Sequence, residues 1–307
     1  MEKKQTILIT GGAGYIGSVL VRRAISKGFH VNVLDQAGGD EFADAPLVKF
    51  FRGSIADYKT IEESLDAVDY VIHLAGVSDG RAGKENPELT KKTNVDCLKQ
   101  LVELSQKAKI KRFIFASTMG VYGNKYDIPL TEDLPLNPID PYSESKALGE
   151  EIIKNEKSDG FFTTVSLRIA MVYGYSPRMR YDFIVNRLTL DALEKKQITI
   201  TGGKQKRPQV YIEDLSNIFL EFLSADESGV NGESFNVVGV NPAIEEIADA
   251  VRQKLPETKI EKLSARDNED SFEVDGGKLK RIIKHAQQKT LDAGIKGIIS
   301  EHNTKKQ

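Results

Sequence analysis

The chain has 307 residues, of which 40% are hydrophobic and 29% charged; this is globular composition, long enough for one large α/β domain with a smaller lobe. The 43 lysines and arginines nearly balance the 45 aspartates and glutamates, so the charge gives no reason to expect nucleic acid or an anionic membrane as partner. Cys97 is the only cysteine, and no apolar run is long enough for a signal peptide or a membrane span, which predicts a cytoplasmic protein without internal disulfides or transmembrane helices.

Strand-like apolar runs alternate with helical periodicity through residues 1–175. The predicted strands cover residues 6–10, 31–34, 48–51, 70–74, 113–116 and 165–168. The predicted helices between them include residues 18–27, 94–107 and 142–155. Strands that alternate with helices favour a parallel sheet covered by helices on both faces. We therefore expect residues 1–175 to form a doubly wound, Rossmann-type α/β domain that binds NAD.

The pattern becomes less regular beyond residue 175. Further helices are predicted at residues 183–195, 212–223 and 244–254, and a strand at residues 234–238. We interpret residues 176–307 as mainly a substrate-binding lobe, with some elements returning to the main sheet. The charged tail after Gly297 is expected to fray. Residues 80–83 are expected to form a mobile loop over the pocket.

A glycine-rich segment directly follows the first predicted strand and opens the first helix. Gly11, Gly14 and Gly17 recur there with the spacing of a dinucleotide-binding turn. Such glycines permit a tight turn, a close approach of the backbone to a pyrophosphate, and close packing of a helix on a strand. The N–H groups at the helix start can bind the phosphates. A plain glycine turn is the alternative, but the strand–turn–helix context favours cofactor binding.

Asp35 ends the second predicted strand, 18 residues after Gly17. A carboxylate at this point accepts hydrogen bonds from the ribose hydroxyls and repels a 2′-phosphate. Gln36 and Ala37 follow it, so no arginine stands at the usual place for that phosphate. The sequence therefore predicts NAD rather than NADP as the cofactor.

A second helix start carries the candidate catalytic pair. Asp140 is predicted as its N-cap and Pro141 as its first helical residue. Tyr142 and Lys146 are four residues apart and so project from one helical face. An ammonium group and the positive helix end both stabilise phenolate, so we expect the pKa of Tyr142 to fall toward the range of a general base. An ordinary surface Tyr–Lys pair has the same spacing and is the alternative.

These motifs occur in an order that is found in a known family. The segments concerned are residues 10–17, Asp35, Asp57, 73–76, 94–95, 117–118, 121–123, Tyr142, Lys146, Arg168, 173–174, Arg207 and 211–214. From residue 6 to about residue 280 the chain resembles the extended short-chain dehydrogenase/reductases, the NAD-dependent nucleotide-sugar epimerase/dehydratase family.

The resemblance implies a role for each matching residue. Thr118 would hydrogen-bond the reacting sugar hydroxyl, Tyr142 would take its proton, and Lys146 would hold the ribose and tune Tyr142. NAD would be contacted by Gly11, Gly14, Tyr15, Ile16, Gly17, Asp35, Ser54, Ile55, Leu74, Ala75, Gly76, Asn94, Ser117, Tyr142 and Lys146. A helix N-cap is the competing interpretation of Asn94. No metal is expected.

The resemblance also implies a nucleotide-sugar substrate, whose diphosphate favours guanidinium groups. Arg207 matches the family's phosphate-binding arginine, and Arg266 is a second candidate. Other candidate substrate contacts are Ser78, Thr118, Tyr142, Arg178, Arg180 and Asn186. For the two arginines of this set, solvated loop positions are the alternative. Ser54 and Met171 replace residues that the family uses at the cofactor and near the substrate phosphates, which leaves the exact substrate open.

Positions 119 and 120 bear on the reaction. Family 4,6-dehydratases place an Asp-Glu pair there, decarboxylases a glutamate at the second position, and reductases that also epimerise a cysteine near the first. This chain has Met119 and Gly120, which disfavours dehydration, decarboxylation and that kind of reduction. We predict a nucleotide-sugar 4-epimerase, because the resemblance implies it as the commonest outcome of this motif set. A dehydrogenase or reductase that releases a keto sugar needs the same residues and is the alternative.

Two further classes fit the sequence less well. A non-catalytic NAD-sensing regulator would not need the intact Thr118, Tyr142 and Lys146 set. An enzyme acting on a small carbonyl compound would not need Arg207. The family also implies a homodimer formed through the helices predicted at residues 94–107 and 142–155.

Overall fold

The fold of the described residues centres on a seven-stranded parallel sheet. The computed structural model describes residues 4–123, 129–156, 161–264, 271–283 and 290–304. The sheet order is β10-β6-β5-β4-β1-β2-β3. Its strands are β1 (Thr6–Thr10), β2 (His30–Asp35), β3 (Val48–Arg52), β4 (Tyr70–His73), β5 (Arg112–Thr118), β6 (Thr163–Ile169) and β10 (Glu233–Val237). The chain changes direction across the sheet between β1 and β4, which is where such folds bind ligands.

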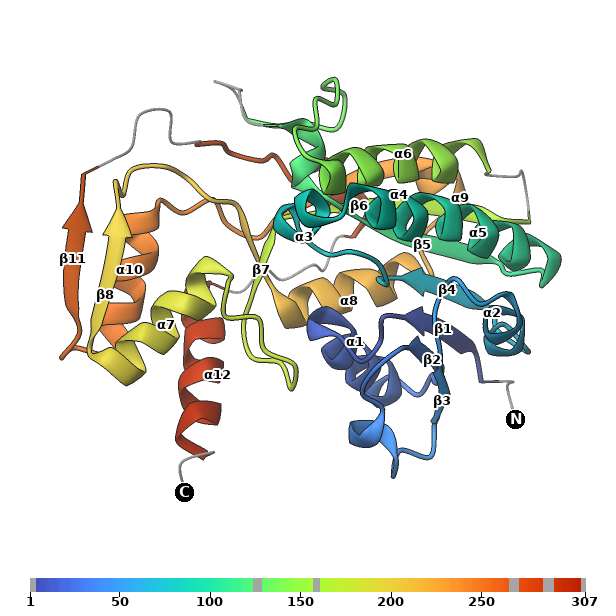
Figure 1. Ribbon diagram of the computed structural model, residues 1–307, viewed down its shortest axis with the longest axis horizontal. Coiled ribbons are helices and arrows are strands. Elements are labelled where there is room, and N and C mark those ends of the chain that lie inside the picture. The colour runs from blue at the N-terminus through green and yellow to red at the C-terminus, as the bar shows by residue number, and fades with distance from the viewer. Residues whose placement is uncertain (1–3, 124–128, 157–160, 265–270, 284–289, 305–307) are drawn as a thin grey trace.

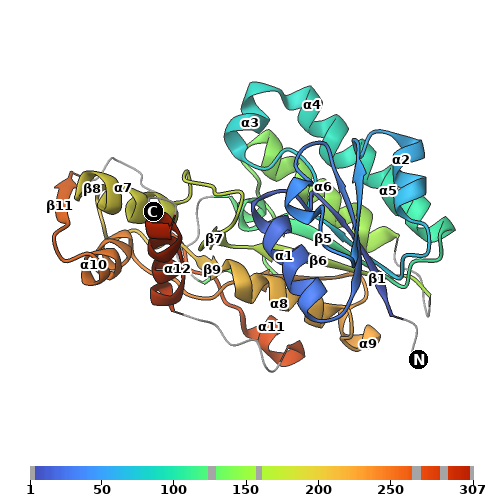
Figure 2. The same ribbon diagram turned by 90° about the horizontal axis from the view of Figure 1, so that it is seen from below.

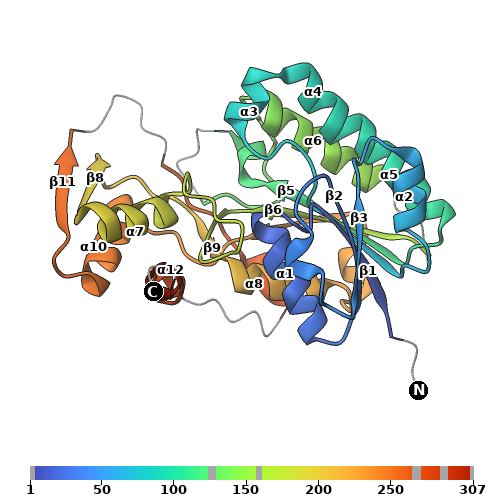
Figure 3. The same ribbon diagram turned by 60° about the horizontal axis from the view of Figure 1, so that its bottom comes forward.

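Helices cover both faces of this sheet. They are α1 (Tyr15–Ser26), α2 (Tyr58–Ser64), α5 (Cys97–Lys107), α6 (Pro141–Asn155) and α8 (Ile212–Phe222). Successive side chains of a strand point to opposite faces, so Ile7 and Ile9 of β1 pack in the core with α1 and α8, whereas Leu8 packs in the core with α2 and α5. Figure 3 shows α1 and α8 on one face and α2, α5 and α6 on the other. The predicted doubly wound architecture is confirmed.

A smaller lobe stands beside the sheet. It contains α7 (Ile184–Lys195), β8 (Gln197–Thr201), α10 (Ile244–Lys254), β11 (Lys259–Leu263) and α12 (Leu291–Thr304), grouped at the left of Figure 1. A short parallel pair, β7 (Met171–Tyr173) and β9 (Gln209–Tyr211), lies between this lobe and the sheet (Figure 2). In contrast, β10 pairs with β6 in the main sheet. Within the described ranges, no helix combines the length and apolar character needed to cross a bilayer.

The remaining elements are short connections. They are α3 (Gly80–Glu85), α4 (Pro87–Lys91), a π-helical segment (Lys92–Asp96), 3₁₀ segments (Asp40–Phe42 and Met119–Tyr122), α9 (Glu227–Val230) and α11 (Gly277–Ile282). The expectation of a loop at residues 80–83 was therefore wrong, because these residues begin α3. The Asp79 carboxylate caps this helix by accepting a hydrogen bond from the Ala82 N–H at 2.9 Å, which supplies one of the partners that a helix start needs.

The expected fraying after Gly297 was also wrong, because α12 continues to Thr304. Its small residues let the helix approach aromatic side chains: a methyl group added at Gly294 would lie 2.5 Å from the Tyr173 ring. Near the end of the helix, the Tyr175 hydroxyl donates to Glu301 Oε1 at 2.8 Å. These tertiary contacts stabilise a segment whose charge alone suggested a disordered end.

One buried histidine of β4 makes stability depend on pH. The ring of His73 is 1% exposed, and its Nδ1 lies 2.7 Å from Thr10 Oγ1. Burial lowers the pKa of His73 to about 3, and the nearby Lys146 charge acts in the same direction. Between the unfolded pKa of about 6.5 and this folded value, the unfolded chain binds one more proton, so acid favours unfolding.

We therefore expect the wild-type protein to lose about 2 kcal/mol of unfolding free energy through His73 between pH 7 and pH 5. Urea unfolding at the two pH values measures the loss. In His73→Gln this part of the pH dependence should disappear, whereas His30→Gln, on β2, should retain it. An identical pH dependence in wild type and His73→Gln would contradict the assignment.

Candidate active site

A cavity of about 1030 Å³ opens at the carboxyl ends of the central strands. Its wall contains most of the residues that the sequence predicted for the site. These are Gly11, Gly14, Tyr15, Ile16, Gly17, Asp35, Ser54, Ile55, Leu74, Ala75, Gly76, Ser78, Ser117, Thr118, Tyr142, Lys146, Arg180 and Arg207. Segments far apart in the sequence therefore meet at one site, where the sheet changes winding direction.

The glycine turn fits the pyrophosphate of a dinucleotide. Gly11 has a φ of 72°, and a methyl group there would lie 2.8 Å from the Ala75 backbone nitrogen. A methyl group at Gly17 would lie 2.2 Å from the Gly11 carbonyl oxygen, so the start of α1 packs directly against the turn. The first turn of α1 contains no acidic residue. Its N–H groups and positive end are therefore suited to an anion.

Asp35 is held at the far end of this turn. One carboxylate oxygen accepts a hydrogen bond from the Ala13 N–H at 3.0 Å, and the other accepts one from the Ala37 N–H at 3.2 Å. The Gly11 N–H donates to the Leu34 carbonyl oxygen at 2.8 Å, which joins the turn to β2. These contacts fix the carboxylate beside the glycines, where an adenosine ribose would be recognised.

Replacing this carboxylate should change cofactor recognition. We expect Asp35→Ala to weaken NAD binding by about tenfold, because a hydrogen bond to a charged group contributes about 1.5–3 kcal/mol. The loss of negative charge should also narrow the preference for NAD over NADP. Isothermal titration with both dinucleotides measures the change. Asp40→Ala, in the following exposed segment, is the control, and an unchanged NAD preference in Asp35→Ala would refute the ribose contact.

The local structure at Tyr142 follows the predicted helix start. Asp140 is the N-cap of α6, and its carboxylate accepts a hydrogen bond from the Ser143 N–H at 3.0 Å, with Pro141 at the first helical position. Lys146 is 5% exposed, and its Nζ donates to the Ala116 carbonyl oxygen at 2.8 Å. That nitrogen lies 5.9 Å from the centre of the Tyr142 ring. One end of β5 thus fixes the lysine beside the tyrosine.

The predicted fall in the pKa of Tyr142 is not found in the structure. Burial raises the pKa of Tyr142 to about 12, and the charges of Asp140 and Asp79 add to the rise. A hydrogen bond with Thr118 and the charge of Arg180 act in the opposite direction. Lys146, whose Nζ is bonded to the Ala116 carbonyl, is itself buried, and this burial lowers its pKa to about 8.

The residues next to Thr118 leave little room for a further catalytic side chain. Thr118 ends β5, and its Oγ1 accepts a hydrogen bond from the Gly120 N–H at 3.2 Å. A methyl group at Gly120 would lie 2.5 Å from Ser143 Oγ. Met119 is 5% exposed and lines the cavity with an apolar side chain. Neither position carries a group that can exchange a proton.

Three predicted contacts lie outside the cavity wall. Asn94 is not a helix N-cap: it lies in the π-helical segment, where its amide bonds the Val77 N–H and carbonyl at 2.8 and 3.1 Å. Asn186 is fully buried, and its amide bonds the Gly174 N–H, the Tyr15 hydroxyl and the Arg180 carbonyl. Both amides therefore hold loops that face the cavity.

The third, Arg178, has a side chain that is 49% exposed and lies 4.0 Å from Glu41. Arg266 lies outside the described residues. Their proposed substrate contacts therefore stay predictions.

A cluster at the cavity wall includes a residue that the sequence did not single out. Asp79 caps α3, and its second oxygen accepts a hydrogen bond from Arg180 Nη2 at 3.3 Å. Arg180 also donates to Ser78 Oγ at 3.1 Å and pairs with Asp182. The position of Asp79 just beyond a strand end was the available indication, but its partner is 101 residues away.

A dinucleotide-binding turn and a Thr–Tyr–Lys group in the wall of one cavity define an oxidoreductase of the short-chain dehydrogenase/reductase class. Residues 7–238 match the model of the NAD dependent epimerase/dehydratase family. The chain belongs to this family. The prediction of an NAD-dependent enzyme of this family is thereby confirmed.

Individual relatives agree with this membership. The chain is 31% identical over 255 residues to a putative UDP-glucose 4-epimerase of Methanocaldococcus jannaschii, covering 81% of this chain and 82% of the relative. It matches the structure of a UDP-glucose 4-epimerase from Thermotoga maritima with UDP-glucose at a TM-score of 0.87 and 27% identity, over 99% and 100% of the two chains. It also matches an NAD-dependent NDP-hexosamine 5,6-dehydratase involved in tunicamycin biosynthesis, at a TM-score of 0.84 and 26% identity, over 98% of each chain.

Proposed function

We propose that this protein is an NAD-dependent nucleotide-sugar 4-epimerase. The observation that carries the proposal is the position of Thr118, Tyr142 and Lys146 in the wall of the same cavity as the dinucleotide-binding turn. Removal of a hydride from the sugar and its return to the opposite face of the sugar ring need only this group of residues, NAD and room for the sugar to turn. Met119 has an apolar side chain and Gly120 has none, which supports epimerisation over dehydration or decarboxylation.

The chain's own residues supply proton transfer and orientation. Tyr142 accepts the proton of the sugar hydroxyl, and Thr118, which hydrogen-bonds the phenol, holds that hydroxyl in line. Lys146, which is held by the Ala116 carbonyl and lines the cavity, would bind the ribose of the cofactor. NAD, when bound, supplies the hydride acceptor and a positive ring that favours the phenolate form of Tyr142. Return of the proton by Tyr142 restores the site.

The substrate is proposed from the charge at the cavity and from the relatives. Arg207 lines the cavity, and its backbone N–H is fixed by the Pro242 carbonyl at 2.9 Å. A guanidinium there suits a diphosphate. The relatives that are named for UDP-glucose support a UDP-sugar. We further propose a cytoplasmic location, which fits the single buried thiol of Cys97.

A panel of UDP-, dTDP-, GDP- and CDP-sugars tests this function. Purified protein with NAD should interconvert a 4-epimer pair while absorbance at the reduced-nicotinamide band shows no net NADH. NADH in amounts equal to the product would instead establish a dehydrogenase that releases a keto sugar. Loss of water or of carbon dioxide, seen by mass spectrometry, would overturn the role given to positions 119 and 120.

A homodimer is proposed through α5 and α6. Leu148 on α6 is 42% exposed, which is an apolar side chain available to a second copy. Light scattering coupled to size-exclusion chromatography should give twice the 34.1 kDa chain mass at micromolar protein. Leu148→Glu should then produce the monomer. A wild-type monomer at that concentration would rule out the proposed dimer.

A further inference from the structure

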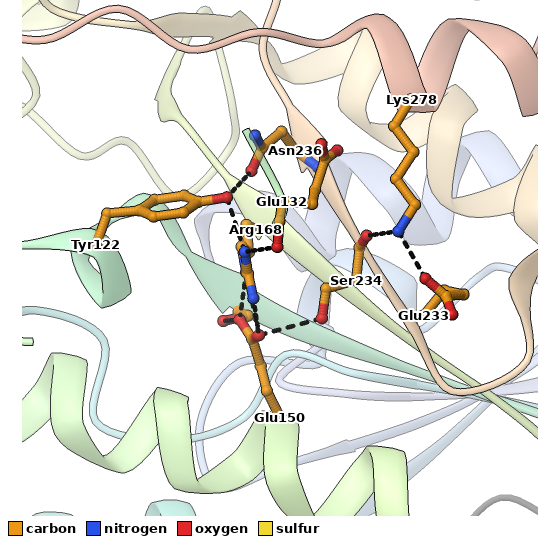
Figure 4. Close-up of polar contacts among 9 residues, drawn as sticks. Tyr122, Glu132, Glu150, Arg168, Glu233, Ser234, Asn236 and Lys278 are labelled. Atoms are coloured by element: carbon orange, nitrogen blue, oxygen red, sulfur yellow. Dashed lines mark hydrogen bonds and ion pairs between the residues drawn. The ribbon is translucent and has the colours of Figure 1, made fainter. Parts of the chain in front are cut away.

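Behind the cavity, polar side chains line up across three neighbouring strands. Ser117 of β5 is in register with Arg168 of β6, which is in register with Asn236 of β10. Arg168 is 5% exposed and Asn236 is fully buried. Figure 4 shows Arg168 between Glu150 of α6 and the Tyr122 hydroxyl. The group begins one residue from Thr118, so it adjoins the candidate catalytic residues.

Glu150 is the charged centre of this group. Its side chain is 6% exposed, and its two oxygens lie 2.8–3.1 Å from Nε and Nη2 of Arg168. Ser117 Oγ donates to the same carboxylate at 2.5 Å, and Ser234 Oγ donates at 3.1 Å. These donors give both oxygens of the carboxylate hydrogen-bond partners.

Arg168 is in turn held from its other side. Its Nη1 donates to the Tyr122 hydroxyl at 2.7 Å, and that hydroxyl donates to Asn236 Oδ1 at 2.7 Å. Burying such an ion pair is often no more stabilising than packing apolar residues in its place. Its position beside the catalytic helix therefore calls for a role other than stability.

The spacing along α6 connects Glu150 to the site. Tyr142, Lys146 and Glu150 follow one another at intervals of four, so they form one stripe on the helix. Lys146 faces these two groups on α6 and His73 on β4, while Arg168 on β6 stands behind Glu150. His73 is uncharged at neutral pH. Glu150 is thus the one carboxylate among the described groups that acts on the Lys146 ammonium.

We propose that Glu150 is a positioning residue that keeps Lys146 protonated, and that Arg168 prevents Glu150 from forming a direct ion pair with Lys146. Arg168 donates from Nε to both carboxylate oxygens and from Nη2 to one of them, while Lys146 donates to the Ala116 carbonyl instead. The charge of Glu150 acts on Lys146 through space, while the ammonium stays directed at Tyr142 and the ribose side. Strand β10 supports this arrangement through Ser234 and Asn236.

The direction of the electrostatic effects agrees with this assignment. Burial lowers the pKa of Lys146, and Glu150 opposes that change. Without the carboxylate charge, Lys146 would release its proton at a lower pH. A neutral Lys146 no longer favours phenolate, so less of Tyr142 would be available as a base near neutral pH.

Titration of Lys146 in the full-length protein tests the proposal. Lysine labelled with ¹³C at Cε is followed by NMR against pH, and Lys146→Met assigns the resonance. Glu150→Gln keeps the shape but removes the charge, so the Lys146 midpoint should fall by about one pH unit or more. Glu150→Asp keeps the charge but disturbs the hydrogen bonds with Arg168, so the Lys146 midpoint in this variant should stay near that of wild type. A purely structural role predicts the reverse ranking or no shift.

The matched control is Glu151→Gln, which removes an exposed charge from the same helix and should leave the midpoint unchanged. Where Glu150→Gln fails to fold, Glu150→Gln/Arg168→Gln removes both buried charges and should still lower the midpoint. An unchanged midpoint in either neutral variant would overturn the proposal. Because no substrate enters the titration, its result does not depend on the proposed 4-epimerase reaction.

Discussion

Tyr142→Phe should lower turnover by about 100-fold or more while leaving the fold intact, because removal of a general base typically costs 10²–10⁴ in rate. The substitution removes only the phenol oxygen, so the rest of the side chain is kept. NAD affinity, measured by titration, should change little. The test compares steady-state rates with the substrate that the nucleotide-sugar panel identifies.

Tyr58→Phe is the matched control for this variant. Tyr58 is 48% exposed at the start of α2, away from the cavity, so the same loss of an oxygen should leave turnover unchanged. Thermal unfolding of both variants shows whether either change acts through stability. Turnover in Tyr142→Phe within a few-fold of wild type would remove the phenol from the reaction.

The sheet and the cofactor turn could be predicted because they depend on local patterns. Apolar runs such as residues 6–10 become strands wherever both faces are covered, and the glycine spacing after β1 has few other uses. The Asp140 cap and the four-residue spacing of Tyr142 and Lys146 are local in the same sense. These features required no knowledge of which distant segments meet.

The features that were missed or wrong depend on tertiary contacts. The pKa of Tyr142 is raised mainly by burial, and the charges of Asp140 and Asp79 add to the rise. The helical end of the chain depends on Gly294 fitting against Tyr173. Glu150 is an ordinary helix residue in the sequence, and only the register of β5, β6 and β10 brings its partners together.

The second large effect is expected at the turn that holds the cofactor, in Gly17→Ala. The added methyl carbon would lie 2.2 Å from the Gly11 carbonyl oxygen and 2.6 Å from the Gly12 Cα. Both are backbone atoms, so α1 must move away from the turn, and overpacking of this kind costs about 1–3 kcal/mol of unfolding free energy. The moved helix start would lose two or so hydrogen bonds to the charged pyrophosphate. Each contributes about 1.5–3 kcal/mol, so NAD affinity should fall by about 100-fold or more.

Gly297→Ala separates this steric effect from the general effect of placing alanine in a helix. A methyl group at Gly297 in α12 would have Tyr175 Cβ as its nearest neighbour, at 3.9 Å. This variant should gain up to about 1 kcal/mol, because alanine favours a helix more than glycine does, and it should bind NAD normally. Calorimetric titration with NAD, together with urea unfolding, measures both quantities in both variants. If Gly17→Ala bound NAD as tightly as wild type, the close contact between α1 and the glycine turn would not be what positions the phosphates, and the cofactor site would need a different anchor.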